Sequence, residues 1–371
     1  MRVLHLLGAT EDTGGILTVL RNLRSTEEER GVEHVVLVHE SYRETRQPSL
    51  RYRKSRHLLA ESPRHLDLLR RTPPALSELR RLLRNEPFDV LHGHSRGALL
   101  LTLGASLLWR RPALFSSHAY ARRKGMYRWA ARRRHLRFSV LTPNMARHYG
   151  LAGPGNRVAV VSECCADRFF TLPLVPRRET AEAARLRLVG LGNIVPWKNW
   201  HLLLEALIRL PEKERGRFEF HHYGPVPAAA DCRTYEHKLR ALATRAAPAR
   251  CEFHGLSLNV EEPLRQADWF VLPSTNEPCS VALIEALALG LPAIASASGG
   301  NVDILTPDRT GVLFAPEDAG DLARQLERLL RGAVRPVAPE RIRDSVRERR
   351  AAAVAARYHA LYEQVRWPRG G

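Results

Sequence analysis

Two glutamates, Glu277 and Glu285, stand eight positions apart around residues that could bind a sugar and a phosphate. Glu285 is the only charged residue between positions 281 and 291, and its neighbours at helical spacing are apolar, so no polar helix face accounts for it. A carboxylate among apolar residues is costly unless it is paired. Two interpretations follow: a core glutamate paired with an arginine, or a carboxylate that accepts hydrogen bonds from the hydroxyl groups of a ligand.

The elements that must position these glutamates are a strand, a helix and a second strand. Residues 269–272 form a short apolar run of strand formers, and residues 280–289 form an apolar run that favours a helix. Ser280 is a good N-cap and Gly290 ends the helix, after which residues 293–296 begin another strand. A strand–helix–strand unit of this kind predicts a right-handed crossover and a parallel sheet.

The start of this helix is the second chemical feature. Free N–H groups at Ser280, Val281 and Ala282 offer hydrogen bonds to an anion. With Glu277 before the helix and Glu285 inside it, the segment supplies acceptors for hydroxyl groups and donors for phosphate. This combination predicts a sugar nucleotide as the ligand.

The N-terminus repeats the order of strand, loop and helix. Residues 2–7 have the pattern of a buried strand, the following loop ends in Gly14 and Gly15, and a helix begins at residue 16. Such a loop brings backbone N–H groups close to a phosphate. The other interpretation of the glycine pair is a simple tight turn.

The chain has 371 residues, of which 44% are hydrophobic, and is long enough for two globular domains. No apolar run reaches the roughly 18–20 residues that a membrane-spanning helix needs, and the first ten residues lack the flanks of a secretory signal. The five cysteines are odd in number and include no CxxC pair, so neither a disulfide framework nor a zinc site is expected. We therefore expect a protein of the reducing cytoplasm.

The net charge of +19 is concentrated in the first half of the chain. Residues 51–84 hold ten basic and three acidic residues, and residues 110–137 hold ten basic residues and no acidic one. Such segments attract nucleic acid, anionic lipid or an acidic substrate, and a generally arginine-rich composition is the alternative explanation. A nucleic-acid-binding protein is a rival interpretation, but the chain lacks an RNA-binding aromatic signature and a helix-turn-helix context, and Glu285 would stay unexplained.

Strand and helix patterns alternate along both halves of the chain, which predicts an α/β protein. Residues 41–62 are polar and basic without clear periodicity, and we expect a loop there. Residues 120–137 and 341–366 are each expected to form one arginine-rich helix. Residues 169–185 are rich in proline and charge and are expected to link the domains.

The sequence PSTNEPCSVALIEALALGLPAIAS, which contains Glu277 and Glu285 and is followed by two glycines, resembles the Glu-x7-Glu segment of the family-four retaining glycosyltransferases (glycosyl transferases group 1). The resemblance implies the GT-B fold: two Rossmann-like domains that face each other across a cleft, with a C-terminal helix that crosses back to the first domain. It implies an acceptor-side domain at 1–168, a linker at 169–185, a nucleotide-sugar-binding domain at 186–345 and the returning helix at 346–371.

The resemblance also implies roles for residues outside this segment. In GNIVPWKN, Lys198 matches a lysine that contacts the leaving diphosphate, while Asn193 stands where relatives carry an arginine. Lys198 is one of only five lysines in an arginine-rich chain. In LFSSHAY, His118 matches a histidine that faces the transferring sugar, and Gly14 and Gly15 match a loop near the donor phosphates.

Two groups of site residues follow from the resemblance. The catalytic group comprises His118, Lys198 and Glu277, and Glu277 would orient the sugar through its hydroxyl groups. Glu285 would hold the hydroxyl groups of the ribose. The donor-binding group comprises Gly14, Gly15, Asn193, Ser280, Val281, Ala282 and Glu285.

Two further segments bear on the site. His94 follows the buried strand pattern at 88–92, at the end where open parallel sheets hold ligands. The segment SECCAD, residues 162–167, stands where relatives usually carry an Asn-Gly-Val-Asp turn, and only Asp167 matches that turn.

The implied reaction is the transfer of a sugar, of the hexosyl type, from a nucleotide-diphosphate donor to a glycan, lipid-linked or other acceptor, with retention of the anomeric configuration. No carboxylate nucleophile is evident, so the leaving phosphate is expected to assist on the same face of the sugar. The chain contains no Asp-x-Asp motif, so neither a metal nor another cofactor is expected.

The setting implied is polysaccharide biosynthesis in the cytoplasm, with peripheral binding to the inner face of the cell membrane through the basic N-terminal domain and without a nucleic-acid partner. A nucleotide-sugar epimerase and a sugar phosphorylase are alternatives on the same fold. The asparagine at position 193 also keeps open an inactive, transferase-like binding protein.

Overall fold

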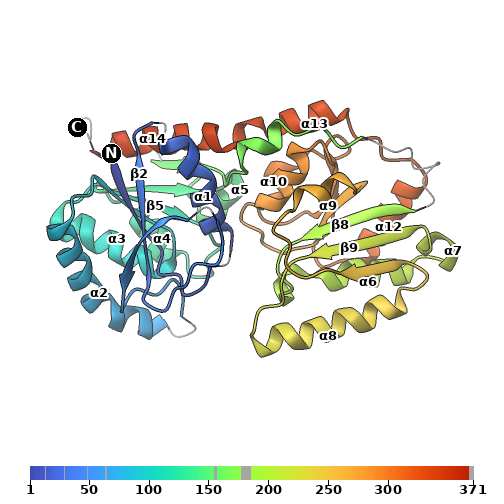
Figure 1. The fold of residues 1–371 in the computed structure, drawn as a ribbon, viewed down its shortest axis with the longest axis horizontal. Coiled ribbons are helices and arrows are strands. Elements are labelled where there is room, and N and C mark those ends of the chain that lie inside the picture. The colour runs from blue at the N-terminus through green and yellow to red at the C-terminus, as the bar shows by residue number, and fades with distance from the viewer. Residues whose placement is uncertain are drawn as a thin grey trace. The chain divides into compact units, whose positions relative to one another are not determined.

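The computed structural model describes residues 1–12, 14–28, 30–47, 49–62, 65–153, 157–176 and 185–366. They form two compact units, each built on a parallel sheet with helices packed against it (Figure 1). Unit 1 comprises Met1–Ala166 and the chain from Arg349 onward, and unit 2 comprises Asp167–Glu348. The predicted linker at 169–185 begins within unit 2, and its residues 177–184 lie outside the described residues.

The sheet of unit 1 has seven strands in the order β3-β2-β1-β4-β5-β6-β7, and all neighbouring pairs are parallel. Its strands are β1 (Arg2–Leu6), β2 (Glu33–His39), β3 (Arg51–Ser55), β4 (Val90–Gly93), β5 (Ala113–Ser117), β6 (Leu136–Val140) and β7 (Val158–Val160). The strand order reverses at β1, whose neighbours are β2 and β4. Parallel sheets bind ligands beyond the carboxyl ends of the strands at such a reversal, so the ends of β1 and β4 mark the expected place.

The helices of unit 1 are α1 (Gly15–Glu28), α2 (His65–Asn85), α3 (Arg96–Trp109), α4 (Gly125–Ala131), α5 (Pro143–Tyr149) and α14 (Ala351–Arg366). Although α14 comes from the far end of the chain, it packs on α1 and against β4, β5 and β6, so that red and blue ribbon lie side by side in Figure 1. The hydroxyl group of Tyr362 in α14 lies 2.9 Å from Nδ1 of His92 in β4, inside the unit. This helix therefore completes the core of unit 1.

The sheet of unit 2 has six parallel strands in the order β10-β9-β8-β11-β12-β13. Its strands are β8 (Leu186–Leu191), β9 (Phe218–Tyr223), β10 (Arg250–Phe253), β11 (Trp269–Leu272), β12 (Ala293–Ser296) and β13 (Gly311–Phe314). The order reverses at β8, between β9 and β11. The predicted strand–helix–strand unit is confirmed as β11, α10 (Val281–Ala288) and β12, with Ser280 as the N-cap.

The other helices of unit 2 are α6 (Trp200–Arg209), α7 (Glu212–Arg215), α8 (Ala230–Arg245), α9 (Glu261–Arg265), α11 (Asn301–Ile304), α12 (Ala319–Leu330) and α13 (Pro339–Ser345). Short 3-10 helices are η1 (Asp167–Phe170) and η2 (Pro196–Lys198), and η3 (Arg347–Arg349) lies at the boundary of the units. None of the helices within the described residues is both long enough and apolar enough to cross a bilayer.

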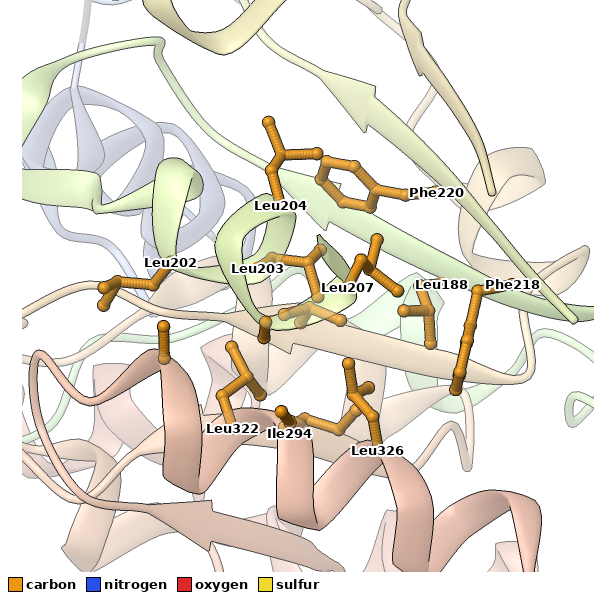
Figure 2. Close-up of a cluster of buried hydrophobic side chains, with 14 of the residues drawn as sticks. Leu188, Leu202, Leu203, Leu204, Leu207, Phe218, Phe220, Ile294, Leu322 and Leu326 are labelled. Carbon is orange, nitrogen blue, oxygen red and sulfur yellow. The ribbon is translucent and has the colours of Figure 1, made fainter. Parts of the chain in front are cut away.

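The core of unit 2 fixes the helix that follows the predicted lysine. Leu203 and Leu207 of α6 face Leu322 and Leu326 of α12, and both pairs are four residues apart, which places each pair on one helix face (Figure 2). All four side chains are fully buried, and each contributes about 1.5–3 kcal/mol by leaving water. Because α6 starts two residues after Lys198, this packing anchors the loop that carries the lysine.

The structure corrects the prediction of a loop at 41–62, because this segment contains β3. β3 is the edge strand of its sheet and pairs with β2. Two of its arginines are held by ion pairs, since Arg51 lies 2.6 Å from Glu33 and Arg53 lies 2.6 Å from Glu86. Backbone pairing and ion pairs, rather than apolar periodicity, hold this strand, so the hydrophobic pattern did not reveal it.

The helix predicted at 120–137 is also wrong over most of its length. The structure has α4 alone in that range, and β6 begins at Leu136. Arg132 caps the end of α4, Arg133 and Arg134 lie between α4 and β6, and Arg137 lies in β6. A run of basic residues therefore spans a helix end, a turn and a strand start.

The helix predicted at 341–366 is divided into α13 and α14. Between them the backbone pairs with Cys165: the N–H group of Cys165 donates to the carbonyl of Arg349 over 3.2 Å, and that of Ala351 donates to the carbonyl of Cys165 over 3.0 Å. These bonds between segments distant in sequence replace the local bonds of a continuous helix.

Candidate functional site

The predicted residues Lys198 and Glu277 meet in unit 2 at the carboxyl ends of β8 and β11. Lys198 ends η2, and Glu277 lies in the loop between β11 and α10. Nζ of Lys198 lies 2.6 Å from Oε2 of Glu277, and the two side chains are only 12% and 10% exposed. Nζ also lies 4.6 Å from the centre of the Trp197 ring, whose face attracts a cation. The predicted cation and carboxylate therefore form one preformed pair.

The glycine pair at 299–300 holds the loop that carries Glu277. The N–H group of Gly300 donates to the carbonyl of Glu277 over 2.7 Å. Gly299 has a φ of +60°, and a Cβ atom there would lie 2.4 Å from that same carbonyl oxygen. Glycine is therefore the residue that fits at position 299, and the pair fixes the backbone of the carboxylate.

The N-terminus of α10 follows Glu277 by four residues. Oγ of Ser280 accepts a hydrogen bond from the N–H group of Leu283 over 3.2 Å, as an N-cap should. Val281 and Ala282 are half-buried in the first turn, where backbone N–H groups have no acceptor within the helix. These groups and the positive end of the helix dipole suit an anion.

Glu285 lies half-buried in α10. Burial raises its pKa to about 8, with the charge of Arg168 opposing this rise and that of Glu261 adding to it. Nε of Arg168 forms an ion pair with Oε1 of Glu261. The arginine whose charge acts on Glu285 is therefore already paired with another carboxylate. Among the described residues no hydrogen bond or ion pair holds the Glu285 carboxylate, which favours a ligand acceptor over a paired core glutamate.

Asn193 lies half-buried in the same loop as Lys198. Its carbonyl accepts a hydrogen bond from Nε1 of Trp200 over 3.1 Å, so the residue is held by the fully buried first residue of α6. Its side chain is an uncharged amide. Lys198 is therefore the cation that this loop supplies.

In unit 1, His118 at the carboxyl end of β5 belongs to a chain of hydrogen-bonded histidines. Nδ1 of His34 lies 2.7 Å from Nε2 of His5, and Nδ1 of His5 lies 2.8 Å from Nε2 of His94. Nδ1 of His94 lies 3.0 Å from Nε2 of His118. Nδ1 of His118 lies 2.7 Å from Oε1 of Glu163. The histidine chain thus runs across four neighbouring strands and ends at a carboxylate.

Glu163 sets the direction of every hydrogen bond in this histidine chain. A carboxylate accepts hydrogen bonds, so the His118 proton is on Nδ1, and Nε2 is left as an acceptor. The same arrangement then repeats at His94 and His5, with Nδ1 donating and Nε2 accepting, and Nδ1 of His34 donates to Nε2 of His5. Burial, and then the neighbouring histidines, hold the pKa values of His5 and His94 well below the usual range, so both rings are neutral at pH 7.

A metal is disfavoured at the centre of this cluster. Ring nitrogens of His5, His92 and His94 lie within 4.8 Å of one another, a spacing that a metal ion could use. However, every ring nitrogen of these three residues already takes part in a hydrogen bond, since His92 bonds the hydroxyl groups of Tyr362 and Ser116 over 2.9 and 2.7 Å. The donors and acceptors are satisfied as they stand.

The structure brings the two predicted histidines, His94 and His118, into contact. Sequence reasoning missed His5, His34 and Glu163. A signal was present, because a histidine within the apolar strand RVLHL is as anomalous as a glutamate within an apolar helix. Glu163 likewise lies in SECCAD, the segment that departs from the turn of relatives.

Gly14 and Gly15 lie at the start of α1, and Thr13 lies outside the described residues. Gly14 has a φ of +93°, which favours glycine. A Cβ atom at either position would meet nothing within 4 Å, so space is open in front of both. This is compatible with the approach of a ligand to the loop.

The sequence matches two family models. Glycosyltransferase Family 4 matches residues 13–180, and Glycosyl transferases group 1 matches residues 177–349. Among curated proteins, the sulfoquinovosyl transferase SQD2 of Arabidopsis thaliana is 30% identical over 174 residues, which are 46% of this chain and 32% of that protein. The chain therefore spans about a third of the length of this relative.

Solved structures share the fold over nearly the whole chain. The sucrose-phosphate synthase of Thermosynechococcus elongatus has a TM-score of 0.80 at 17% identity, covering 98% of this chain and 99% of that one. HepE of Anabaena, solved in complex with UDP-glucose, has a TM-score of 0.69 at 15% identity, covering 98% of both chains. At these identities the likeness concerns the fold: two Rossmann-like domains of the GT-B type.

Proposed function

Because the chain belongs to the group 1 (family-four) glycosyltransferases, we propose that it transfers a sugar from a nucleotide-diphosphate donor to a glycan, lipid-linked or other acceptor. The observation that carries this proposal is the preformed ion pair of Lys198 and Glu277. Glu277 lies four residues before the first residue of α10, so the pair is close to the N-terminus of that helix. A cation and free N–H groups suit a diphosphate, and a carboxylate suits the hydroxyl groups of a sugar. The pair also favours an active enzyme over an inactive binding protein, because Lys198 supplies a cation although position 193 holds an amide.

The proposed chemistry centres on the charge of the leaving group. When the bond between the anomeric carbon and the donor phosphate breaks, negative charge builds up on the diphosphate. Nζ of Lys198 and the N–H groups of Val281 and Ala282 are the donors that we propose for this charge. Glu277 would accept sugar hydroxyl groups, and Glu285 would accept those of the ribose.

The role proposed for His118 follows from what its ring already binds. Both ring nitrogens are engaged, one by Glu163 and one by His94, so neither is left for a ligand. Within the described part of the chain, no group donates a hydrogen bond to the main-chain carbonyl of His118. We infer that this carbonyl is the group that His118 offers to a hydroxyl of the sugar or acceptor, and that the histidine chain holds the residue in place.

Retention of configuration and independence of metal are part of the proposal. Neither an Asp-x-Asp motif nor an evident carboxylate nucleophile is present in the sequence, so we propose that the leaving phosphate assists the attack on its own face of the sugar. UDP-glucose is the first donor to test, because HepE of Anabaena was solved with it. An NMR spectrum of the product gives its anomeric configuration, and a chelator tests the need for a metal.

A donor screen tests the function and its alternatives. Thermal shifts with a panel of nucleotide sugars identify a donor, and turnover with candidate glycan and lipid-linked acceptors identifies the reaction. A donor that is epimerised without any acceptor would indicate an epimerase, and a glycan that is cleaved by inorganic phosphate to a sugar phosphate would indicate a phosphorylase. A donor that binds but is never turned over would indicate the inactive protein.

We also propose a cytoplasmic protein that binds peripherally to the inner face of the cell membrane during polysaccharide biosynthesis. The support is the excess of basic over acidic residues at 51–84 and 110–137. Binding to vesicles should then require anionic lipid and weaken with salt. Equal binding to neutral vesicles would reject this part of the proposal.

A further inference from the structure

A groove of about 850 Å³ lies in unit 1, at the edge of the sheet opposite to His118. Its walls are residues just before and at the start of β5, β6 and β7, together with the last turn of α14. Because these strands are parallel, the groove lies at their amino ends, whereas His118 follows the carboxyl end of β5. A strand of five residues spans about 16 Å, so the groove is separate from the site described above.

Cations dominate the lining of this groove. Seven arginines line it against one glutamate, and the seven are Arg110, Arg111, Arg133, Arg134, Arg137, Arg157 and Arg366. Arg366 is paired with Glu363 over 3.3 Å and with Asp89 over 3.2 Å. Within the described ranges, no carboxylate lies at ion-pair distance from Arg110, Arg111, Arg134, Arg137 or Arg157. This excess of positive charge in a concave lining favours the binding of an anion.

Arg137, the second residue of β6, is the sharpest sign of a missing partner. Its side chain is half-buried, and its Nε atom is buried without a hydrogen-bond partner. Burial, and then the charge of Arg157, lower the pKa of Arg137. A buried donor without an acceptor costs stability. An anion bound beside Arg137 and Arg157 would offset the charge that Arg157 places on Arg137.

The chemistry of the lining selects a class of anion. Arginine forms paired hydrogen bonds with phosphate and is preferred for its recognition. Among the described residues that line the groove there is no tryptophan, tyrosine or phenylalanine, and His135 is the only aromatic ring on which a base of a nucleic-acid strand could stack. We propose that the groove binds a compact anion with two or more phosphoryl groups, seated on Arg137 and Arg157. A free oligophosphate and the phosphate headgroups of anionic lipids share this chemistry.

Two binding assays with the full chain separate these sources. Calorimetric titration with tripolyphosphate tests the free anion, and flotation with phosphatidylcholine vesicles, with and without phosphatidic acid, tests the lipid. Arg157→Glu changes an exposed groove residue and should weaken binding by about tenfold or more. Arg209→Glu makes the same charge change at the exposed end of α6, outside the groove and outside both basic segments, and should change the affinity by less than about twofold.

Arg137→Met gives an independent readout. Removal of a half-buried, unpaired cation should raise the Tm of the free protein, and it should abolish the further rise that tripolyphosphate gives the unmodified chain. If Arg137 were only a structural residue, the substitution would lower Tm and leave the response to phosphate intact.

Each outcome decides the proposal. Tripolyphosphate binding that Arg157→Glu weakens and Arg209→Glu does not supports a free oligophosphate, and the same pattern with phosphatidic acid vesicles alone supports a lipid headgroup. Equal effects of the two substitutions, no binding of either phosphate source, or groove-dependent binding of an oligonucleotide alone would overturn it. Sugar transfer does not pass through this groove, so a negative result here leaves the transferase proposal standing.

Discussion

Lys198→Met should lower both the stability and the activity of the protein, and a second change, Glu277→Gln, should restore stability alone. The two side chains form a nearly buried ion pair over 2.6 Å. Loss of the ammonium leaves an unpaired carboxylate in a site that water barely reaches. Loss of both charges leaves two neutral groups of similar size. Activity needs the ammonium itself, because the proposed diphosphate has no other side-chain cation in this loop.

The magnitudes follow from the geometry. At 2.6 Å and an effective dielectric constant of about 20, the attraction between unit charges is about 6 kcal/mol, and desolvation of two nearly buried groups offsets most of it. Removal of one partner should cost about 3–5 kcal/mol of unfolding free energy, whereas removal of both should be nearly neutral. Turnover should fall by about 10²–10³-fold in the single and in the double variant, as when a donor to a developing negative charge is lost.

Urea unfolding and initial rates with the identified donor measure the two effects. The matched control is Lys238→Met in the same unit, because Lys238 lies 3.5 Å from Glu205 in a pair whose side chains are 50% and 34% exposed. This change should cost no more than about 1 kcal/mol and leave turnover intact. If the double variant regained turnover together with stability, Lys198 would be only the structural partner of Glu277, and its role toward the diphosphate would be refuted.

Three further predictions concern other parts of the chain. Burial raises the pKa of Glu285 in the folded protein from 4.5 to about 8. The stability that its protonated form contributes is therefore fully present below about pH 4.5 and is lost as the pH rises toward about 8. Across this window, the Tm of the unmodified chain should fall relative to the Tm of the Glu285→Gln variant. Glu163→Leu, which removes the acceptor, should remove the strongly hydrogen-bonded Nδ1–H proton signal of His118 from the NMR spectrum and lower kcat/KM by about tenfold, and an unchanged signal would contradict the assigned tautomers. Leu326→Ala should cost about 2–5 kcal/mol in urea unfolding, and the partly buried Leu330→Ala on the same helix should cost clearly less.

Sequence reasoning succeeded where the signals are local. Ser280 as a cap, the apolar run after it and the strands on either side specify α10 and its neighbours within about thirty residues, and the structure confirms them. The family resemblance covers the same segment. The edge strand β3 was missed because its residues are polar, and their ion-pair partners Glu33 and Glu86 lie elsewhere in the chain.

Local sequence patterns could not predict contacts between segments that are distant in the sequence. Lys198 and Glu277 were each predicted, yet their direct contact joins residues 79 positions apart and depends on β8 lying beside β11. The histidine chain requires the strand order β2-β1-β4-β5, which no local pattern specifies. The sequence revealed the basic segment at 110–137 but not that Arg157 and the end of α14 complete a concave site with it.

The return of α14 to unit 1 has a consequence for biosynthesis. Unit 2 is one uninterrupted stretch, Asp167–Glu348, and can complete its core once that stretch has left the ribosome. Unit 1 begins first but lacks the hydroxyl group that Tyr362 gives to His92, and the cover over β4, β5 and β6, until α14 has been translated. Domains usually mature in the order of synthesis. Unit 2 does not depend on α14 and unit 1 does, so a released chain that ends before α14 should hold a protease-resistant unit 2 and a protease-sensitive unit 1.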